Sequence, residues 1–269
     1  MTEVFITVKT YPTLSKKYDE LVCTAGITDE GNWIRIYPVP FRKLDFDNKY
    51  VKYQWLSIPL IRNVEDFRPE SYRIENFNAI TQKEKIKDWD MRRQIILGKT
   101  PIYTNMNTLI EKAKNKELSL ATFKPQKITD FIVEATERNW PKDKLELLKA
   151  KSQQLSFFQT IDEIKREFSV VNKVPYKFSY QFTDDTGKTR TLMIEGWEIG
   201  MLYWNCLKAT NNDEKSAIEK IRQKYFGEFL EKDIFLFLGT TKAWHNVAPD
   251  PFVIIGIFVP PRQYHKLLF

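Results

Sequence analysis

The chain has 269 residues, of which 42% are hydrophobic, and it carries a formal net charge of +7 with a pI near 9.1. Because compact domains commonly contain roughly 100–150 residues, this length predicts two domains. The basic balance argues against a mimic of an acidic protein and favours a polyanionic partner, without choosing between nucleic acid and an anionic membrane surface.

Strand patterns dominate the first part of the chain. Val4, Ile6 and Val8 alternate with other residues, and a turn at residues 29–32 leads into a second apolar run. Apolar residues at helical spacing then appear around Trp89, and strand patterns return after them. The sequence predicts strands over residues 3–10, 21–27, 32–39, 53–61, 71–77, 118–123 and 129–136, and helices over residues 83–97 and 106–116.

A charged helix predicted over residues 142–154, with Pro141 in its first turn, marks the expected boundary between two halves. Beyond it, the turn-rich residues 184–188 predict a hairpin. The predicted elements of this half are strands over residues 176–183, 189–195, 234–239 and 252–259, and helices over residues 198–208 and 213–231. Neither half alternates strands and helices as a doubly wound sheet does, so we expect two small, partly closed barrels.

Cysteine and glycine usage excludes several classes of protein. Cys23 and Cys206 lie far apart in apolar surroundings, which predicts reduced thiols in a cytoplasmic protein. No run approaches the roughly 20 apolar residues of a membrane helix, and no leader segment precedes the first strand, so no membrane partner is expected. Neither GxGxxG nor GxxxxGKS/T occurs, which excludes nucleotide hydrolysis by those loops, and no cofactor is expected.

Five segments of the chain stand out together: residues 8–15, 20–27, 33–42, 196–203 and 254–261. They resemble the corresponding segments of a prokaryotic family described as a dual OB-containing domain. The resemblance spans nearly the whole chain and implies an α+β, β-rich fold with two small OB-like antiparallel barrels and helical insertions. The N-terminal barrel with its helical insertion would occupy residues 1–138, and the C-terminal barrel with its linking and inserted helices residues 139–269. By analogy with other OB folds, nucleic-acid contact is implied, within a prokaryotic defence system.

Aromatic residues, prolines and cations are mixed at the ends of the early strands. On an OB-like face, bases can stack on aromatic rings at roughly 1–3 kcal/mol per base while cations follow the phosphates. Tyr11 and Tyr37 each adjoin a proline at a strand exit, where loops reach the surface. The candidate nucleic-acid contacts are Lys9, Tyr11, Lys16, Lys17, Arg35, Tyr37, Phe41, Arg42, Lys52 and Tyr53.

Ordinary structural roles compete with this interpretation. Aromatic residues on alternating strands usually belong to a core, so Trp33 and Trp55 are expected to be packed rather than free to touch a ligand. The adjacent Lys16 and Lys17 can equally form a solvated turn.

A second candidate lies in the loop that follows an apolar strand near residue 239. Lys242, Trp244 and His245 combine a cation, an indole and an imidazole, which suits binding. His245 is also a candidate for acid–base catalysis, although a structural histidine is the simpler expectation. His265 is expected to be incidental.

Glu195 and Glu198 flank a predicted junction between a strand and a helix. Neighbouring carboxylates can hold Mg²⁺ for phosphodiester cleavage, but a glutamate at a helix start also stabilises the helix dipole. Asp184 and Asp185 are expected to form a turn. No HExxH, CxxC or DxDxDG pattern occurs, so no dedicated metal site is expected.

Three functions remain open. The first is a cytoplasmic module that binds single-stranded or structured nucleic acid, with DNA and RNA not distinguished. The second is a metal-dependent or histidine-assisted enzyme acting on nucleic acid or a nucleotide, which requires Glu195, Glu198 and His245 to converge in one pocket. The third is a protein-interaction module, which requires an exposed apolar patch.

Overall fold

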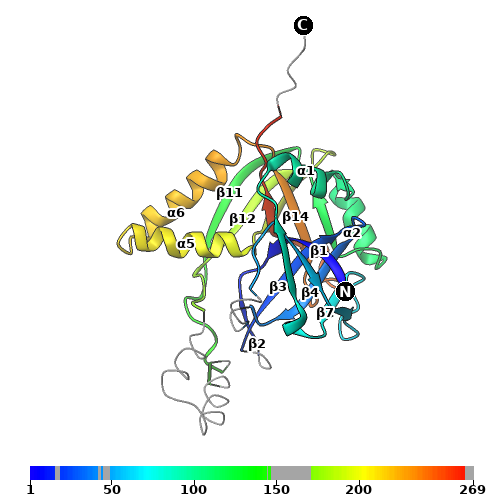
Figure 1. The fold of residues 1–269 in the computed structure, drawn as a ribbon. Coiled ribbons are helices and arrows are strands. Elements are labelled where there is room, and N and C mark those ends of the chain that lie inside the picture. Colours follow the sequence, from blue (N-terminus) through cyan, green and yellow to red (C-terminus); the bar gives the residue numbers. More distant parts are fainter. Residues whose placement is uncertain (16–18, 42–43, 45–48, 144, 147–170, 264–269) are drawn as a thin grey trace.

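The structure is a computed structural model that describes residues 1–15, 19–41, 44, 49–143, 145–146 and 171–263. It has a mixed α+β architecture rich in strands, as the sequence predicts (Figure 1). The predicted helix over residues 142–154 falls largely outside the described residues.

The first sheet is built from the N-terminal part of the chain and curls strongly. Its path runs β6-β7-β4-β3-β1-β5-β8, and β2 pairs with β3 beside this path. The pairs are antiparallel except for β4 with β7. The strands are β1 (Thr2–Lys9), β2 (Thr13–Ser15), β3 (Asp19–Thr28), β4 (Trp33–Val39), β5 (Gln54–Ile58), β6 (Leu60–Arg62), β7 (Ser71–Ile74) and β8 (Thr81–Lys85).

Two further sheets form the rest of the β-structure within the described ranges. One has the order β15-β14-β10-β9 and the other β11-β12-β13. A bridge between Ile194 and Ile254 links them, and a bridge between Thr10 and Gly196 links them to the end of β1. The strands are β9 (Ile102–Tyr103), β10 (Leu120–Phe123), β11 (Lys127–Ala135), β12 (Tyr176–Thr183), β13 (Thr189–Met193), β14 (Phe235–Thr240) and β15 (Phe252–Phe258).

The helices that cover these sheets in the described part of the chain are α1 (Trp89–Leu97), α2 (Met106–Lys114), α5 (Trp197–Ala209) and α6 (Glu214–Gln223). Helices α5 and α6 flank β11 and β12, as Figure 1 shows. Each of α1, α2 and α6 begins with an Asp or Asn whose side chain accepts a backbone N–H of the first turn, which satisfies a donor that the helix leaves open.

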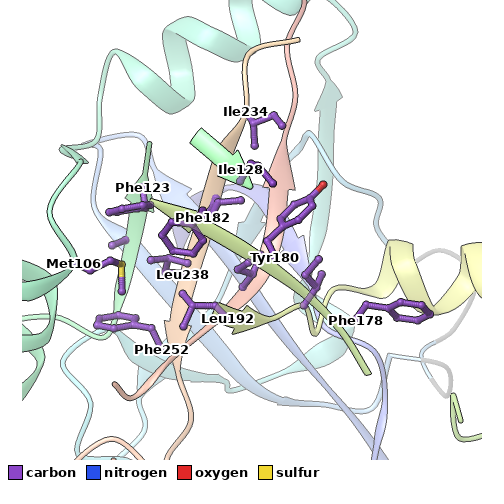
Figure 2. Close-up of a cluster of buried hydrophobic side chains, with 14 of the residues drawn as sticks. Met106, Phe123, Ile128, Phe178, Tyr180, Phe182, Leu192, Ile234, Leu238 and Phe252 are labelled. Atoms are coloured by element: carbon purple, nitrogen blue, oxygen red, sulfur yellow. The ribbon is translucent and has the colours of Figure 1, made fainter. Parts of the chain in front are cut away.

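The largest core lies between the later sheets and their helices. Side chains from β10, β12, β14 and β15 point toward one another there, including Phe123, Phe182, Leu238 and Phe252 (Figure 2). The first sheet is buried on both faces, because Val4 and Ile6 enter one apolar cluster while Phe5 enters another. Trp33 and Trp55 pack against this second cluster, which confirms the expectation that they are core residues.

The turn predictions are confirmed by the hairpins that they close. β3 and β4 pair through a turn in which Gly31 has φ +89°, a conformation that glycine adopts readily. β12 and β13 pair through residues 184–188, where an oxygen of the Asp184 carboxylate accepts the backbone N–H groups of Thr186 and Lys188.

Two helix predictions were wrong in extent. Residues 83–85, predicted as the start of a helix, belong instead to strand β8 (Thr81–Lys85), an exposed edge strand paired with β5. The charges of such an edge strand resemble the polar face of a helix in sequence, but here they protect a sheet edge. The long helix predicted over residues 213–231 is α6 followed by a π-helical turn, Lys224–Glu228.

The hydrogen-bonded sheets cross the predicted division at residues 138 and 139. β10 pairs with β14 and β11 pairs with β12, so the two strands that precede the division belong to the later sheets. The pairing follows from the apolar content of β10, whose four residues are all buried.

Candidate functional site

A cleft opens where the first sheet meets the ends of β13, β14 and β15. It consists of two neighbouring hollows that share Tyr37 and Lys242 in their lining, which we name the inner hollow (about 260 Å³) and the outer hollow (about 300 Å³). The inner hollow is further lined by Thr10, Thr13, Cys23, Arg35, Arg68, Glu195, Thr240, Thr241, Val253 and Ile255. The outer hollow is further lined by Leu21, Pro38, Pro40, Asn63, Glu65, Asp66, Arg73, Ile74 and Phe77.

The cleft brings together segments that are distant in sequence. Tyr37 lies near the end of β4, where Asn63 donates to its backbone carbonyl at 3.0 Å. Lys242 comes from the loop after β14, and Glu195 follows β13. The structure therefore places the first-half strand exit at Tyr37 beside the second-half loop that contains Lys242, and both segments are sequence-predicted sites.

Two arginines lie behind the inner hollow. Arg35 is only 2% exposed; its guanidinium donates to the Ser119 hydroxyl at 2.6 Å and to the carbonyl oxygens of Ser119 and Thr240 at 3.2 and 3.4 Å. Arg68 also donates to the Thr240 carbonyl, at 2.5 Å. Arg35, a predicted nucleic-acid contact, thus uses its donors to join the first sheet to β10 and β14.

Two carboxylates, the buried Asp66 and the half-buried Glu70, lie beside these two cations. Asp66 accepts from the Arg68 guanidinium at 2.6 and 2.9 Å and from the Ser71 hydroxyl at 2.8 Å. Burial alone would raise the pKa of Asp66, but the hydrogen bonds and charge of Arg68 outweigh it and lower the pKa to about 2. Glu70 accepts from the Ser119 hydroxyl at 2.6 Å and from the Ser119 backbone N–H at 2.7 Å.

Glu195 differs from these carboxylates because the protein leaves its side chain free. Among the described residues, its carboxyl group has neither a hydrogen-bond partner nor an ion-pair partner. Burial raises its pKa. Its backbone is held on both sides, because Tyr11 donates to its carbonyl at 2.9 Å and its own N–H donates to the Ile254 carbonyl at 2.8 Å.

Two loops form an exposed apolar surface beside the cleft, which we call the loop patch. The patch consists of Val64, Phe67, Trp244 and Val247, with exposed fractions of 86, 42, 58 and 71%. The Lys242 ammonium donates to the Glu65 carbonyl at 2.5 Å and so ties the two loops together.

His245 lies beneath the loop patch rather than on it. It is buried, its Nδ1 is 2.7 Å from the Thr240 hydroxyl, and its ring meets the Phe67 ring edge to face at 5.3 Å between centroids. Burial lowers its pKa and the nearby positive charge of Arg68 adds to the effect, so the ring is neutral at physiological pH. These contacts match the simpler expectation of a structural histidine.

The carboxylates of the predicted enzyme site have separate environments. Glu195 lines the inner hollow, whereas Glu198 at the start of α5 forms an ion pair with Lys52 at 3.0 Å. Burial opposes the charge of Lys52, but Glu198 outweighs it and raises the pKa of that lysine. Asp184 accepts hydrogen bonds within its own turn, as expected.

Other predicted contact residues make internal contacts. The Lys9 ammonium lies 4.2 Å from the centre of the Phe41 ring, and burial lowers the pKa of Lys9, partly offset by Glu198. The Tyr11 hydroxyl donates to the Asn172 carbonyl and accepts from the Trp204 indole, both at 2.8 Å. The Tyr53 ring packs against Phe5 and other core rings. Lys16, Lys17 and Arg42 lie outside the described residues.

The sequence predictions did not include the loop over residues 63–70. It supplies Asp66 and Arg68 to the interior and Val64 and Phe67 to the loop patch. Two large apolar residues within a short charged segment between strands are a signal that could have identified it.

A separate basic hollow of about 350 Å³ lies away from the cleft. Its lining includes Lys124, Lys127, Lys232 and Arg262 with one carboxylate, Asp233. Asp233 forms ion pairs with Arg93 at 3.0 Å and with Lys124 at 3.3 Å.

Within the described ranges, no group of three or more His, Cys, Asp or Glu side chains lies close enough to hold a metal ion. Over the same residues, no helix combines the length and apolar character needed to span a lipid bilayer.

Comparisons with known proteins relate the whole chain to two domain families. One family model, described as a domain of unknown function (DUF8758), matches residues 1–98, and another, also described as a domain of unknown function (DUF8757), matches residues 103–269. No curated protein matches the chain. Among solved structures, the chain is similar to one titled as a murine DNA binding protein bound with double-stranded DNA, with 11% identity and a TM-score of 0.31 over 98% of this chain and 97% of that one.

Proposed function

The chain belongs to the DUF8757 family, and from its cleft we propose that the protein binds nucleic acid. The observation that carries the proposal is the position of Tyr37 and Lys242, which together line both hollows. A ring and a cation at one place suit a base and its neighbouring phosphate. The exposed Trp244 indole on the adjoining loop offers a second stacking surface.

The cations around the cleft suit an anionic partner, and the carboxylates among them mean that this partner contacts only a few positive charges. Lys242 and Arg73 line the outer hollow beside Glu65 and Asp66, and Asp66 is already paired with Arg68. The nucleic acid would follow this rim, with unpaired bases reaching the rings of Tyr37 and Trp244. Single-stranded or locally unpaired nucleic acid fits this arrangement, because only unstacked bases present a free face to aromatic side chains.

Fluorescence anisotropy with labelled single-stranded DNA, single-stranded RNA and duplex DNA tests this function. We expect log affinity to fall linearly with log salt between about 50 and 200 mM, since bound cations release counterions. Tyr37→Ala and Trp244→Ala should each weaken binding by roughly 1–3 kcal/mol, whereas Tyr37→Phe retains the ring and should bind normally.

Charge-matched variants supply the control. Lys242→Gln should weaken binding and reduce the salt slope, whereas Lys127→Gln removes an equal charge from the separate basic hollow and should change little. If Lys127→Gln lost more affinity for the oligonucleotide than Lys242→Gln, the interface would be assigned to the separate basic hollow instead. The absence of any binding at low salt would refute the proposal.

A protein-interaction role is a second candidate, favoured by the loop patch. Four exposed apolar side chains on two adjoining loops are the kind of surface that protein partners bury. This role predicts association that is insensitive to salt and lost with Val64→Ser or Val247→Ser. The nucleic-acid role predicts that these two substitutions leave oligonucleotide affinity unchanged.

The OB-like nature of the two halves, and with it membership of a dual OB-containing family, is also a proposal. The curl of the first sheet and its antiparallel run β4-β3-β1-β5 support it, because OB folds are partly open antiparallel barrels. An experimental structure in which the first sheet does not close toward a barrel would count against it.

A further inference from the structure

Among the described residues that line the inner hollow, Glu195 and Thr241 each have a polar side-chain group without a protein partner. The Glu195 carboxyl lines the hollow with no protein partner among the described residues, while its backbone is fixed by bonds to Tyr11 and Ile254. Glu195 is half-buried, and burying a carboxyl group without a partner is unfavourable. A ligand that supplies hydrogen-bond donors would satisfy it.

The two arginines that line the inner hollow already have partners within the protein. Arg35 donates to Ser119 and Thr240, and Arg68 donates to Asp66 and Thr240. A carboxylate without a partner would repel a phosphate group, and the arginines already donate to oxygen atoms of the protein. A phosphate group in the hollow itself is therefore disfavoured. The same carboxylate favours a neutral group with N–H donors at one edge.

The remaining walls suit a flat, partly apolar group. Val253 and Ile255 provide aliphatic contact from β15, and Tyr37 provides a ring at the side shared with the outer hollow. At about 260 Å³, the hollow falls just below the roughly 300–1,000 Å³ range of small-molecule sites. This size fits one nucleobase with part of its sugar better than a longer piece of a strand.

We infer that the inner hollow receives a single unpaired base of the bound nucleic acid, and that Glu195 selects guanine. This inference rests on the proposed function and adds the chemical identity of the bound group. Guanine carries two adjacent donors, N1–H and the N2 amino group, which one carboxylate can accept together. Thymine and uracil present a single N–H between two carbonyl oxygens, which the carboxylate repels.

The route into the hollow follows from the shared residues. Because Tyr37 and Lys242 line both hollows, a strand lying along the outer hollow can place its phosphate near Lys242 while one base turns inward past Tyr37. Enzymes and readers that take a base out of a stack recognise its hydrogen-bonding edge in the same manner.

The test compares three labelled oligothymidylates in anisotropy measurements: one with a single central guanine, one with hypoxanthine at that position, and one with thymine throughout. The unmodified protein should bind the guanine probe about 5- to 100-fold more tightly than the all-thymine probe, the range expected for one bidentate base contact. Hypoxanthine keeps N1–H but lacks the amino group, so its probe should fall between the two.

Glu195→Gln should abolish the guanine preference while binding the all-thymine probe as the unmodified protein does. The matched control is Glu198→Gln, which removes a nearby carboxylate that pairs with Lys52 and should keep the preference. Since burial raises the pKa of Glu195, the preference of the unmodified protein should fade on acidification at a pH above the ordinary carboxyl range.

The outcomes separate the two proposals. Binding of all three probes with equal affinity overturns the guanine site and leaves nucleic-acid binding intact. A guanine preference that survives in Glu195→Gln removes Glu195 from recognition and also overturns the inference. Failure to bind any of the three probes overturns both.

Discussion

Asp66 is the residue that makes the buried arginines of the cleft tolerable. Its carboxylate accepts from Arg68 at 2.6 Å, and Arg68 and Arg35 both donate to the Thr240 carbonyl. An interior ion pair of this kind costs desolvation energy on both sides and is stable only when the remaining donors are bonded. Here Ser71 also donates to Asp66 at 2.8 Å, so the cluster meets that condition.

Acid should lower the free energy of unfolding because it protonates Asp66. Its pKa is about 2 in the folded state against an ordinary 3.8, so its stabilising contribution is complete above the unfolded value and disappears as pH falls through the folded one. The size of the effect is about 2 kcal/mol. Urea unfolding at a series of pH values should show this loss in the unmodified protein, and Asp66→Asn should lack it. An equal loss in both proteins would assign acid sensitivity to other groups.

At the scale of elements, helix α5 approaches the end of β1 closely at Gly200. A Cβ atom at this position would lie 2.1 Å from the Tyr11 ring. The ring cannot move aside easily, because its hydroxyl group bonds both Asn172 and Trp204. The contact explains why a glycine occupies the interior of a helix, where it normally lowers helix stability.

Gly200→Ala should therefore destabilise the protein by roughly 1–3 kcal/mol, although alanine favours helix formation. The thermal midpoint is the measurement. In the Tyr11→Ala background the obstruction is absent, and the same Gly200→Ala substitution should be neutral or stabilising. If Gly200→Ala stabilises the protein with Tyr11 present, the close contact is not a constraint.

Sequence patterns predicted most strands and their turns because alternation and turn chemistry act locally. β1, β3 and β4 follow from Val4, Ile6 and the turn at Gly31. The misassigned β8 shows the limit of this reasoning, since Gln82 and Lys83 become a strand only through pairing with β5. That pairing is a tertiary contact, which no short window of sequence contains.

The candidate site could be predicted only in part, for a related reason. Tyr37 and Lys242 were predicted by their aromatic, proline-rich or polar neighbours, and both line the cleft. Arg35 and Tyr11 matched the same pattern but have internal partners that lie far away in sequence, Ser119 and Trp204. The composition near a strand exit identifies side chains that are able to bind a nucleic acid. Whether such a side chain is exposed depends on which distant segment of the chain packs against it.

At the scale of the whole molecule, Arg35 and Glu70 connect the first sheet to the later ones through Ser119. Both side chains converge on this residue, at 2.6 Å between each of them and its hydroxyl group. The isolated strand bridge between Thr10 and Gly196 is the backbone counterpart of this connection. The sheets therefore share one polar junction in addition to their apolar contacts.

Arg35→Met should lower the free energy of unfolding by roughly 1–3 kcal/mol, because it leaves the buried hydroxyl and carbonyl oxygens of Ser119 without the guanidinium that donates to them. Urea denaturation followed by tryptophan fluorescence measures the change. Arg222→Met is the matched control, since Arg222 pairs with Asp130 at 3.5 Å near the surface and should contribute less than about 1 kcal/mol. If both variants lost the same free energy of unfolding, the junction would stabilise the protein no more than a surface ion pair does.

The bridge between Thr10 and Gly196 also indicates the order in which parts of the fold form during synthesis of the chain. β1 leaves the ribosome shortly before β3, with which it pairs, but Tyr11 must wait for Glu195 before its backbone N–H is bonded. Val253 and Ile255, which close the inner hollow, are translated later still. Contacts so far apart in sequence form slowly. The cleft is thus a late product of biosynthesis, and a truncated chain that ends before β15 has no inner hollow to fill.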